Sequence, residues 1–222
     1  MFDNKKTREM RMYSGVAETL SASAYNFILG LTILYGFVVN AILVAVAGDF
    51  FMAMNPILFL VIYFVLGIGG SIIARRSSNP AVSFLGYNML VLPVGGLLSV
   101  YLPYYQGADI LAALVVTGIA VGLMLIASTL FPAFFAGLGR TLFFSLLIGL
   151  IGEIVATLLG YGGNLFNWAF IIIFTLYIGF DWCRAQAYPK TVDNAIDSAL
   201  DIYLDIINLF IRILEIMGRR ND

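Results

Sequence analysis

The chain has 222 residues, of which 61% are hydrophobic and 11% are charged, and its net charge is −1. Soluble domains carry about 25% charged residues, so this composition excludes a water-soluble globular protein and indicates one that crosses a membrane several times. The apolar runs are long and continuous, which favours helices over a β-barrel. The sequence has no histidine and one cysteine, which excludes imidazole-dependent catalysis, histidine-ligated metals and an intrachain disulfide.

Seven apolar segments follow a polar N-terminal tail, and each is close to the roughly 20 residues that cross the hydrocarbon layer. The tail covers 1–23 and lacks the features of a cleavable signal peptide. We expect spans at 24–47, 56–74, 82–102, 109–130, 141–159, 164–184 and 193–217. The predicted fold is an all-α bundle of seven transmembrane helices in a single domain, 24–217, with a short C-terminal tail at 218–222.

Basic residues predict the orientation. Lys and Arg occur in the N-terminal tail, after the second span, before the fifth and after the sixth, whereas the connections after spans one, three and five have none. The positive-inside rule then places the N-terminus in the cytoplasm. Seven crossings would leave Arg219 and Arg220 outside, against that rule, so the last segment either crosses or re-enters. We expect it to cross.

Two pairs of small residues stand four positions apart within apolar segments. They are Gly67 with Ser71 and Gly118 with Gly122. Such pairs let neighbouring helices approach closely, so we interpret both as packing sites.

The last segment, 193–217, differs from the others because a polar stripe runs along it. Asp201, Asp205, Asn208, Arg212 and Glu215 follow one another at steps of four and three, which places them on one helix face. A central Asp or Arg costs roughly 2.5–3.5 kcal/mol to insert into a bilayer. We therefore expect this helix to be central in the bundle, with its stripe facing other helices or a wet cavity.

An amphipathic helix lying at the membrane surface is the alternative for this segment. Its polar face would then usually be basic, but this one is acidic and an anionic leaflet would repel it. Asp193 and Asp197, at the start of the same segment, are interpreted as helix-capping and first-turn residues.

Two stretches resemble the Bax inhibitor-1, or TMBIM, family of membrane proteins. They read IIIFTLYIGFD at 171–181 and YLDIINLF at 203–210, and 108–128 is a looser match. The 24-residue spacing from Asp181 to Asp205 is also that of the family's bacterial members. The resemblance implies a seven-helix fold around the C-terminal helix and a pH-sensitive calcium leak in a bacterial cell membrane.

The resemblance also implies site residues. Asp181 and Asp205 match the family's pH sensor and ion gate and would form a weak calcium site, while Arg75 or Arg76 matches an arginine latch. Asp201, Asn208 and Glu153 are candidates for an accessory ion path. Asp201 and Glu153 are additions to the family pattern, and glutamates in the second and fourth spans of some bacterial members have no counterpart here.

Elementary electrostatics suggests how the pair Asp181 and Asp205 would work. Two carboxylates in a poorly hydrated space do not both ionise easily, and such a pair can titrate near neutral pH as a coupled unit. Our hypothesis is that the ionised pair holds the arginine and keeps the cytoplasmic end shut. Protonation, or a divalent cation on the carboxylate oxygens, would release it.

Two other classes of function compete with a channel. A membrane-embedded regulator of other membrane proteins, for example a protease modulator, would use the acidic stripe only structurally. An intramembrane aspartyl protease is disfavoured, because Gly179-Phe180-Asp181 lacks the GxGD pattern. We expect no enzyme and no cofactor; the expected partners are the lipid bilayer, protons, transported calcium ions and other membrane proteins, and no nucleic acid.

Overall fold

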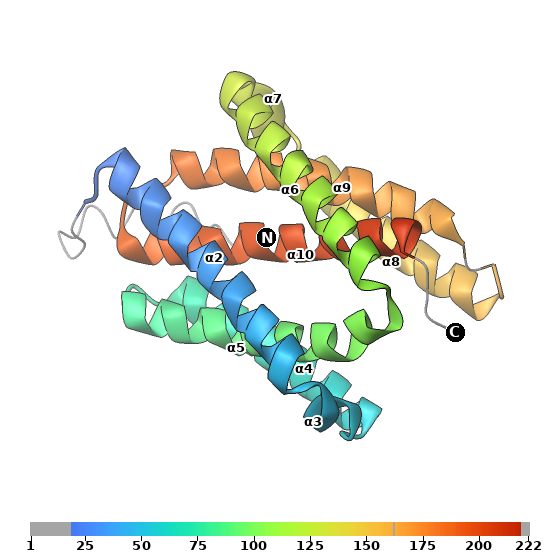
Figure 1. Cartoon of the computed structure of the whole chain (residues 1–222). Coiled ribbons are helices and arrows are strands. Elements are labelled where there is room, and N and C mark those ends of the chain that lie inside the picture. Colours follow the sequence, from blue (N-terminus) through green and yellow to red (C-terminus); the bar gives the residue numbers. More distant parts are fainter. Residues whose placement is uncertain (1–18, 162, 219–222) are drawn as a thin grey trace. The chain divides into compact units, whose positions relative to one another are not determined.

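The computed structural model describes residues 19–161 and 163–218, and those residues form helices without a β-strand. The parts of the expected tails at 1–18 and 219–222 lie outside the described residues. The helices, shown in Figure 1, are α2 (Ala22–Val46), α3 (Gly48–Met52), α4 (Pro56–Arg76), α5 (Pro80–Tyr101), the short 3₁₀ helix η1 (Leu102–Tyr104), α6 (Gly107–Leu130), α7 (Pro132–Gly137), α8 (Gly139–Leu158), α9 (Asn164–Ala187) and α10 (Val192–Met217).

These helices fall into two compact units. The first comprises α2 to α5 and the part of α10 that ends at Asp201. The second comprises α6 to α9 and the rest of α10, from Ile202 onward. The domain expected at 24–217 therefore includes both units, and α10 contributes to each.

Two helices of the first unit begin with the same Asn-Pro pair. The Asn55 Oδ1 accepts hydrogen bonds from the amides of Ile57 and Leu58, at 2.9 and 3.1 Å, and the Asn79 Oδ1 accepts one from the amide of Ala81 at 2.9 Å. The proline that follows each asparagine has no amide hydrogen to leave unpaired and already has a helical φ. The start points of α4 and α5 are thus encoded locally.

Helices α4 and α5 touch backbone to backbone at Gly70 and Gly86. A Cβ atom added at Gly70 would lie 2.5 Å from the Gly86 carbonyl oxygen, and one added at Gly86 would lie 2.5 Å from the Gly70 oxygen. Neither carbonyl can move aside without shifting its helix. The close approach of α4 and α5 therefore depends on both glycines.

The small pairs singled out from the sequence are not such contact points, so that interpretation is wrong. A Cβ atom at Gly67, Gly118 or Gly122 would meet no other group within 4 Å. Spacing along a helix shows which residues share a face, but it does not show which face meets a neighbour.

Glycines of α8 lie against phenylalanine rings of α9 in the second unit. A Cβ at Gly139 would be 2.7 Å from the Phe180 ring, and one at Gly149 would be 3.1 Å from the Phe170 ring. Gly152 likewise faces Phe166. The residue numbers rise on α8 as they fall on α9, so these helices run antiparallel with a ring seated on each glycine.

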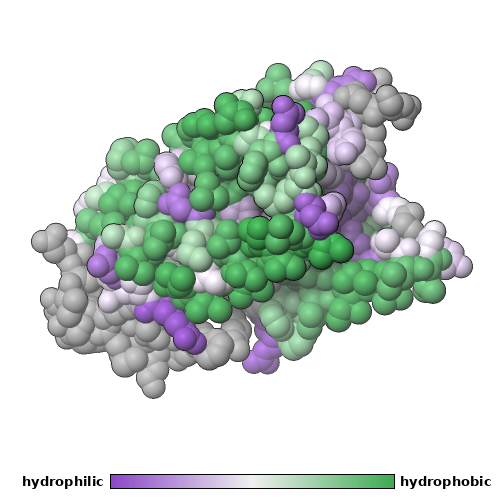
Figure 2. Space-filling view, turned by 90° about the horizontal axis from the view of Figure 1, so that it is seen from below, coloured by the Kyte–Doolittle hydropathy of each residue, from purple (hydrophilic) through white to green (hydrophobic). Residues whose placement is uncertain are grey.

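Six helices of the described chain are long and apolar enough to cross a membrane: α2, α4, α5, α6, α8 and α9. Their outward faces carry large apolar side chains, such as Leu111, Val115 and Ile119 of α6, all more than half exposed. Figure 2 shows hydrophobic residues covering much of one face of the molecule. Water would not tolerate so large an apolar surface, which makes this an integral, multi-pass membrane protein.

The helix expected for the seventh span is present as α10, with almost the predicted bounds. It is not among the six apolar helices, because acidic residues occupy much of its length. Side chains on both its polar and its apolar face are buried, including Asp197 at 1% and Leu200 at 0% exposure. That burial disfavours a helix lying on a membrane surface. The crossing itself, and a central place in the bundle, stay predictions.

The contact between α4 and α5 gives a first test. Replacing Gly70 by alanine should lower the free energy of unfolding by roughly 1–3 kcal/mol, the usual cost of overpacking, because its Cβ would press on the Gly86 carbonyl. Thermal unfolding of the purified protein in detergent, followed by size-exclusion chromatography, measures the change.

Gly67→Ala is the matched control, since it lies one turn away on the same helix in open space. That substitution should leave the melting temperature unchanged or raise it slightly, because alanine favours a helix by up to about 1 kcal/mol over glycine. Equal melting temperatures for the two variants would contradict the described helix contact.

Candidate functional site

The start of α10 is capped and tied to α5. The Thr191 hydroxyl accepts a hydrogen bond from the Asn194 amide at 3.2 Å, which is the usual role of a threonine before a helix. The buried Ser83 hydroxyl of α5 donates to the Asp193 carboxylate at 2.5 Å. Asp193 therefore serves as an anchor between helices as well as a first-turn residue.

Helix α2 holds the same segment through Tyr25, which is fully buried. Its hydroxyl donates to the Asn194 carbonyl at 3.3 Å and lies 3.0 Å from the Ser198 hydroxyl. The ammonium group of Lys190 lies 4.4 Å from the centre of the Tyr25 ring, a cation–π arrangement. Burial lowers the pKa of Lys190, which lies in the connection before α10.

Helix α4 contributes the third tie, at the point where α10 leaves the first unit. The Arg75 guanidinium forms an ion pair with the Asp201 carboxylate at 2.5 Å, and the Asp201 side chain is only 6% exposed. Arg76, its neighbour, is exposed. Of the two arginines considered for a latch, Arg75 thus contacts α10, and its partner is Asp201, a residue expected from the sequence to belong to an accessory path.

Asp181 lies on α9 in the second unit and is 7% exposed. The Arg184 guanidinium, one turn along the same helix, forms an ion pair with it at 3.0 Å. The next two residues fasten this turn to α6: Trp182 donates to the Thr129 hydroxyl at 3.2 Å, and the Cys183 thiol donates to the Ser128 carbonyl at 3.2 Å. The carboxylate therefore sits on a well-anchored helix turn.

Asp205 lies on the part of α10 that belongs to the second unit and is 8% exposed. It and Asp181 both interact electrostatically with the Tyr177 hydroxyl of α9. The two acids expected to form a pair therefore lie in the same unit, each within electrostatic range of Tyr177. Asn208, one turn beyond Asp205, donates to the Leu204 carbonyl of its own helix at 2.7 Å.

The described residues around Asp181 and Asp205 do not form a dense cluster of metal ligands. Among the described residues, no group of three or more His, Cys, Asp or Glu side chains has the geometry to hold a metal ion. Calcium usually takes six to eight oxygen ligands. The weak calcium site that the resemblance implies at Asp181 and Asp205 stays a prediction, and it would need further oxygen ligands from backbone carbonyls or water.

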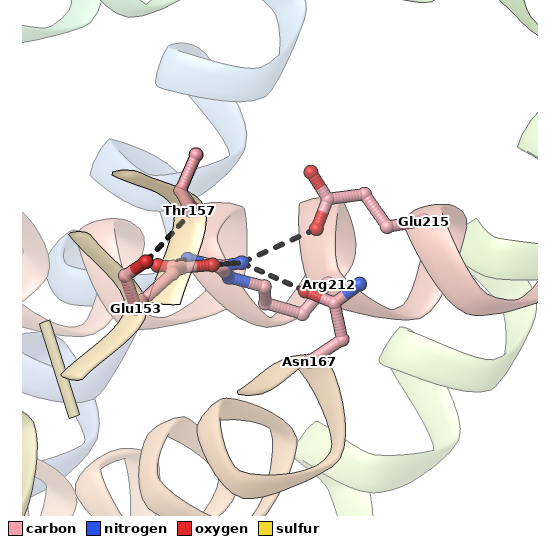
Figure 3. A network of polar contacts seen from close by, with 5 residues as sticks. All are labelled: Glu153, Thr157, Asn167, Arg212 and Glu215. Atoms are coloured by element: carbon pink, nitrogen blue, oxygen red, sulfur yellow. Dashed lines mark hydrogen bonds and ion pairs between the residues drawn. The ribbon is translucent and has the colours of Figure 1, made fainter. Parts of the chain in front are cut away.

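Glu153 belongs to a second polar cluster, which we call the Arg212 cluster and which comprises Glu153, Asn167, Phe170, Arg212 and Glu215. Figure 3 draws its polar members. Both terminal nitrogens of Arg212 donate to the Glu153 carboxylate, at 2.5 and 2.8 Å, across α10 and α8. The same guanidinium reaches the Asn167 Oδ1 at 2.7 Å and the Glu215 carboxylate at 3.3 Å. The Phe170 ring centre lies 4.4 Å from it. Glu153 is therefore the counter-ion of Arg212.

Three of the residues that contact the α10 segment were not predicted from the sequence. Ser83, Tyr25 and Asn167 are isolated polar residues in apolar spans, and no motif surrounds them. Their positions did carry a signal, because a polar side chain inside a span needs a hydrogen-bonding partner on another helix. The sequence could not show that α10 would supply the partner in each case.

Two curated relatives match part of the chain. An uncharacterized protein of Helicobacter pylori (strain ATCC 700392 / 26695) is 32% identical over 114 residues, which is 50% of this chain and 48% of that protein. An uncharacterized protein of H. pylori strain J99 matches to the same extent. The aligned region thus spans about half the length of the curated relatives it matches.

A protein-family comparison covers much more of the sequence. The model of the family described as "Inhibitor of apoptosis-promoting Bax1" matches residues 16–222. The match includes the six apolar helices, α10 with its buried acids, and the turn of α9 that carries Asp181. This integral membrane protein belongs to the Bax inhibitor-1 family.

Proposed function

We propose that the protein is a pH-sensitive cation leak, with calcium as the transported ion, gated by Asp181 and Asp205 and held shut through Arg75. The observation that carries the proposal is the burial of both acids, at 7% and 8% exposure, within the same compact unit. Acidic groups placed in a membrane protein's interior are costly and are usually retained for a function. Calcium itself is indicated by the family alone.

The proposed sensor works through the number of protons that Asp181 and Asp205 share. Near neutral pH, two buried acids can exchange one proton as a coupled unit. No histidine is present to compete as a sensor in this range. Additional protons would neutralise the pair and break the ion pair between Asp181 and Arg184. The proposed gate would then loosen, so the leak should rise as the cytoplasmic pH falls.

Arg75 enters the proposal through its ion pair with Asp201. This contact ties α10 to α4 at the last α10 residue of the first unit. Asp205 follows Asp201 by one helical turn, or ~6 Å along the axis, and a helix transmits rotation along its length. Release of Arg75 would therefore free the segment that carries the gate. The Asp201 contact replaces the direct contact with Asp181 or Asp205 that the resemblance implies.

The proposal includes the orientation of the chain in the membrane. The distribution of Lys and Arg supports a cytoplasmic N-terminus in a bacterial cell membrane. The Arg75–Asp201 pair, at the end of the second apolar helix, would then lie on the cytoplasmic side.

A regulator of other membrane proteins is the second candidate. The family description itself, which names an inhibitor, favours it. A regulator would need the buried acids for packing only. Transport by the purified protein separates the two candidates, because a regulator without its own path would give no leak in a protein-containing vesicle.

The gate can be tested in proteoliposomes loaded with a calcium-sensitive dye. Wild-type protein should admit calcium, and the rate should rise several-fold between about pH 8 and pH 6. Asp181→Asn and Asp205→Asn should each remove most of this pH dependence, because a coupled pair cannot titrate once one acid is lost.

Asp49→Asn serves as the control for that experiment, since it removes an exposed acid from the short helix α3. It should keep the wild-type pH profile. A folded wild-type protein that admits no more calcium than empty vesicles would refute the leak and favour the regulator.

The Arg75–Asp201 pair predicts a separate phenotype. Arg75→Gln should raise the calcium leak at pH 8 by roughly two- to fivefold, because a partly exposed ion pair contributes about 0.5–1 kcal/mol to the closed state. Asp201→Asn should act in the same direction. The measurement is the initial rate of dye response at constant protein content.

Arg76→Gln is the matched control for charge, because it removes a neighbouring but exposed guanidinium. Its leak at pH 8 should equal that of wild type. If Arg76→Gln opened the leak and Arg75→Gln did not, Arg75 would not be the latch.

A further inference from the structure

The Arg212 cluster contains one more carboxylate than is needed to neutralise its guanidinium. One guanidinium faces two carboxylates, those of Glu153 and Glu215, which gives the cluster a net charge of −1. Glu153 takes the bidentate position at 2.5 and 2.8 Å, while Glu215 is at 3.3 Å. Asn167 and the Phe170 ring complete the surroundings of the guanidinium. Side chains of three helices, α8, α9 and α10, thus contact the guanidinium of Arg212, as Figure 3 shows in part.

The cluster continues the polar stripe of α10 beyond the proposed gate. Asp205, Asn208 and Arg212 follow one another on one face, and Arg212 lies seven residues, or ~10 Å, from Asp205 along the helix axis. The sequence supplies few other charges to this part of the second unit: within α8 and α9 they are Arg140, Glu153, Asp181 and Arg184. A cation that moved from Asp205 along the stripe would next meet Arg212.

The cluster is only partly enclosed by the protein. The side chain of Arg212 is 17% exposed, and those of Glu153 and Glu215 are each 27% exposed. A guanidinium so placed would repel a passing cation. At about 8 Å, one unit charge changes the local concentration of a divalent cation roughly sixfold where water dominates the screening, and far more where protein does. The adjacent carboxylates oppose that repulsion.

We infer that Arg212 is the charge barrier of the cation path and that Glu153 is the counter-ion that lowers it. This inference rests on the proposed leak and extends it by naming residues that set its rate and charge preference. Arg212 and Glu153 then act by their charges on the passing ion. Their effect on transport should follow the sign of the charge that is removed, whereas a pair that only fastened helices together would respond alike to the loss of either partner.

The test is a charge cycle on the full-length protein in dye-loaded liposomes. Glu153→Gln leaves the cluster neutral and should lower the calcium leak at least twofold, while Arg212→Gln makes it doubly negative and should raise the leak at least twofold. The double variant regains the wild-type net charge and should return toward the wild-type rate. Glu215→Gln should lower the leak like Glu153→Gln without breaking the bidentate contact.

Two controls separate charge from structure. Thr157→Val removes a hydroxyl that donates to the Glu153 backbone carbonyl at 2.8 Å, with no change of charge, and should leave the leak unchanged. Thermal unfolding in detergent reports how much each variant loses in stability. Glu153→Gln and Arg212→Gln should both lower the melting temperature, so only the transport rates should move in opposite directions.

The outcomes are distinct. If wild type leaks and the rates of Glu153→Gln and Arg212→Gln change in the same direction, or not at all, the inference is overturned and the leak stands. If Glu153→Gln fails to fold, Glu215→Gln against Arg212→Gln decides the same question. If wild type itself does not leak, the proposed function fails first, and the charge barrier at Arg212 fails with it.

Discussion

The cost of placing charge away from water governs α10 more than any other element. Its length and helical bounds resemble those of a membrane span, but no lipid-facing helix could carry so many charges. Other helices of both units supply partners for these charges: Ser83 and Arg75 in the first unit, and Glu153 in the second. Each tie combines a buried acid or arginine with a polar side chain of another helix. Within each unit, these buried charges therefore find their partners between α10 and an apolar helix.

Charge pairing differs between the two parts of α10. In the first unit the acid lies on α10 and the arginine on α4, and Arg75 is 41% exposed on its side chain. In the second unit the arginine is Arg212 of α10. It is mostly buried, and side chains of three helices contact its guanidinium. A half-exposed pair is weakened by solvent and salt, whereas a bidentate and largely buried one is held firmly. The first is thus the more readily broken, which suits a switch, and the second suits a fixed element.

Much of the fold follows from local rules, which is why it could be predicted from the sequence. The expected segment 193–217 differs from α10 by one residue, and the span expected at 56–74 begins at the first residue of α4. The short helices α3 and α7 were not predicted, since they are single turns within connections. The partners of Arg75 and Glu153 were not predicted for another reason. A helical face is readable from spacing, but the helix it meets depends on packing between distant segments, as the misplaced small-residue pairs also show.

The seating of phenylalanine rings on the glycines of α8 has a mechanical consequence. Where a phenylalanine ring packs against a glycine, no side chain on the glycine can change rotamer to relieve a clash. Sliding α8 along α9 would have to lift three rings at once, those of Phe166, Phe170 and Phe180. The packing therefore opposes even a small sliding of α8 along α9, and these two helices should move together as one rigid pair. Any opening of the protein would be expected to occur around that pair, leaving Glu153 of α8 and Asn167 of α9 at a constant separation.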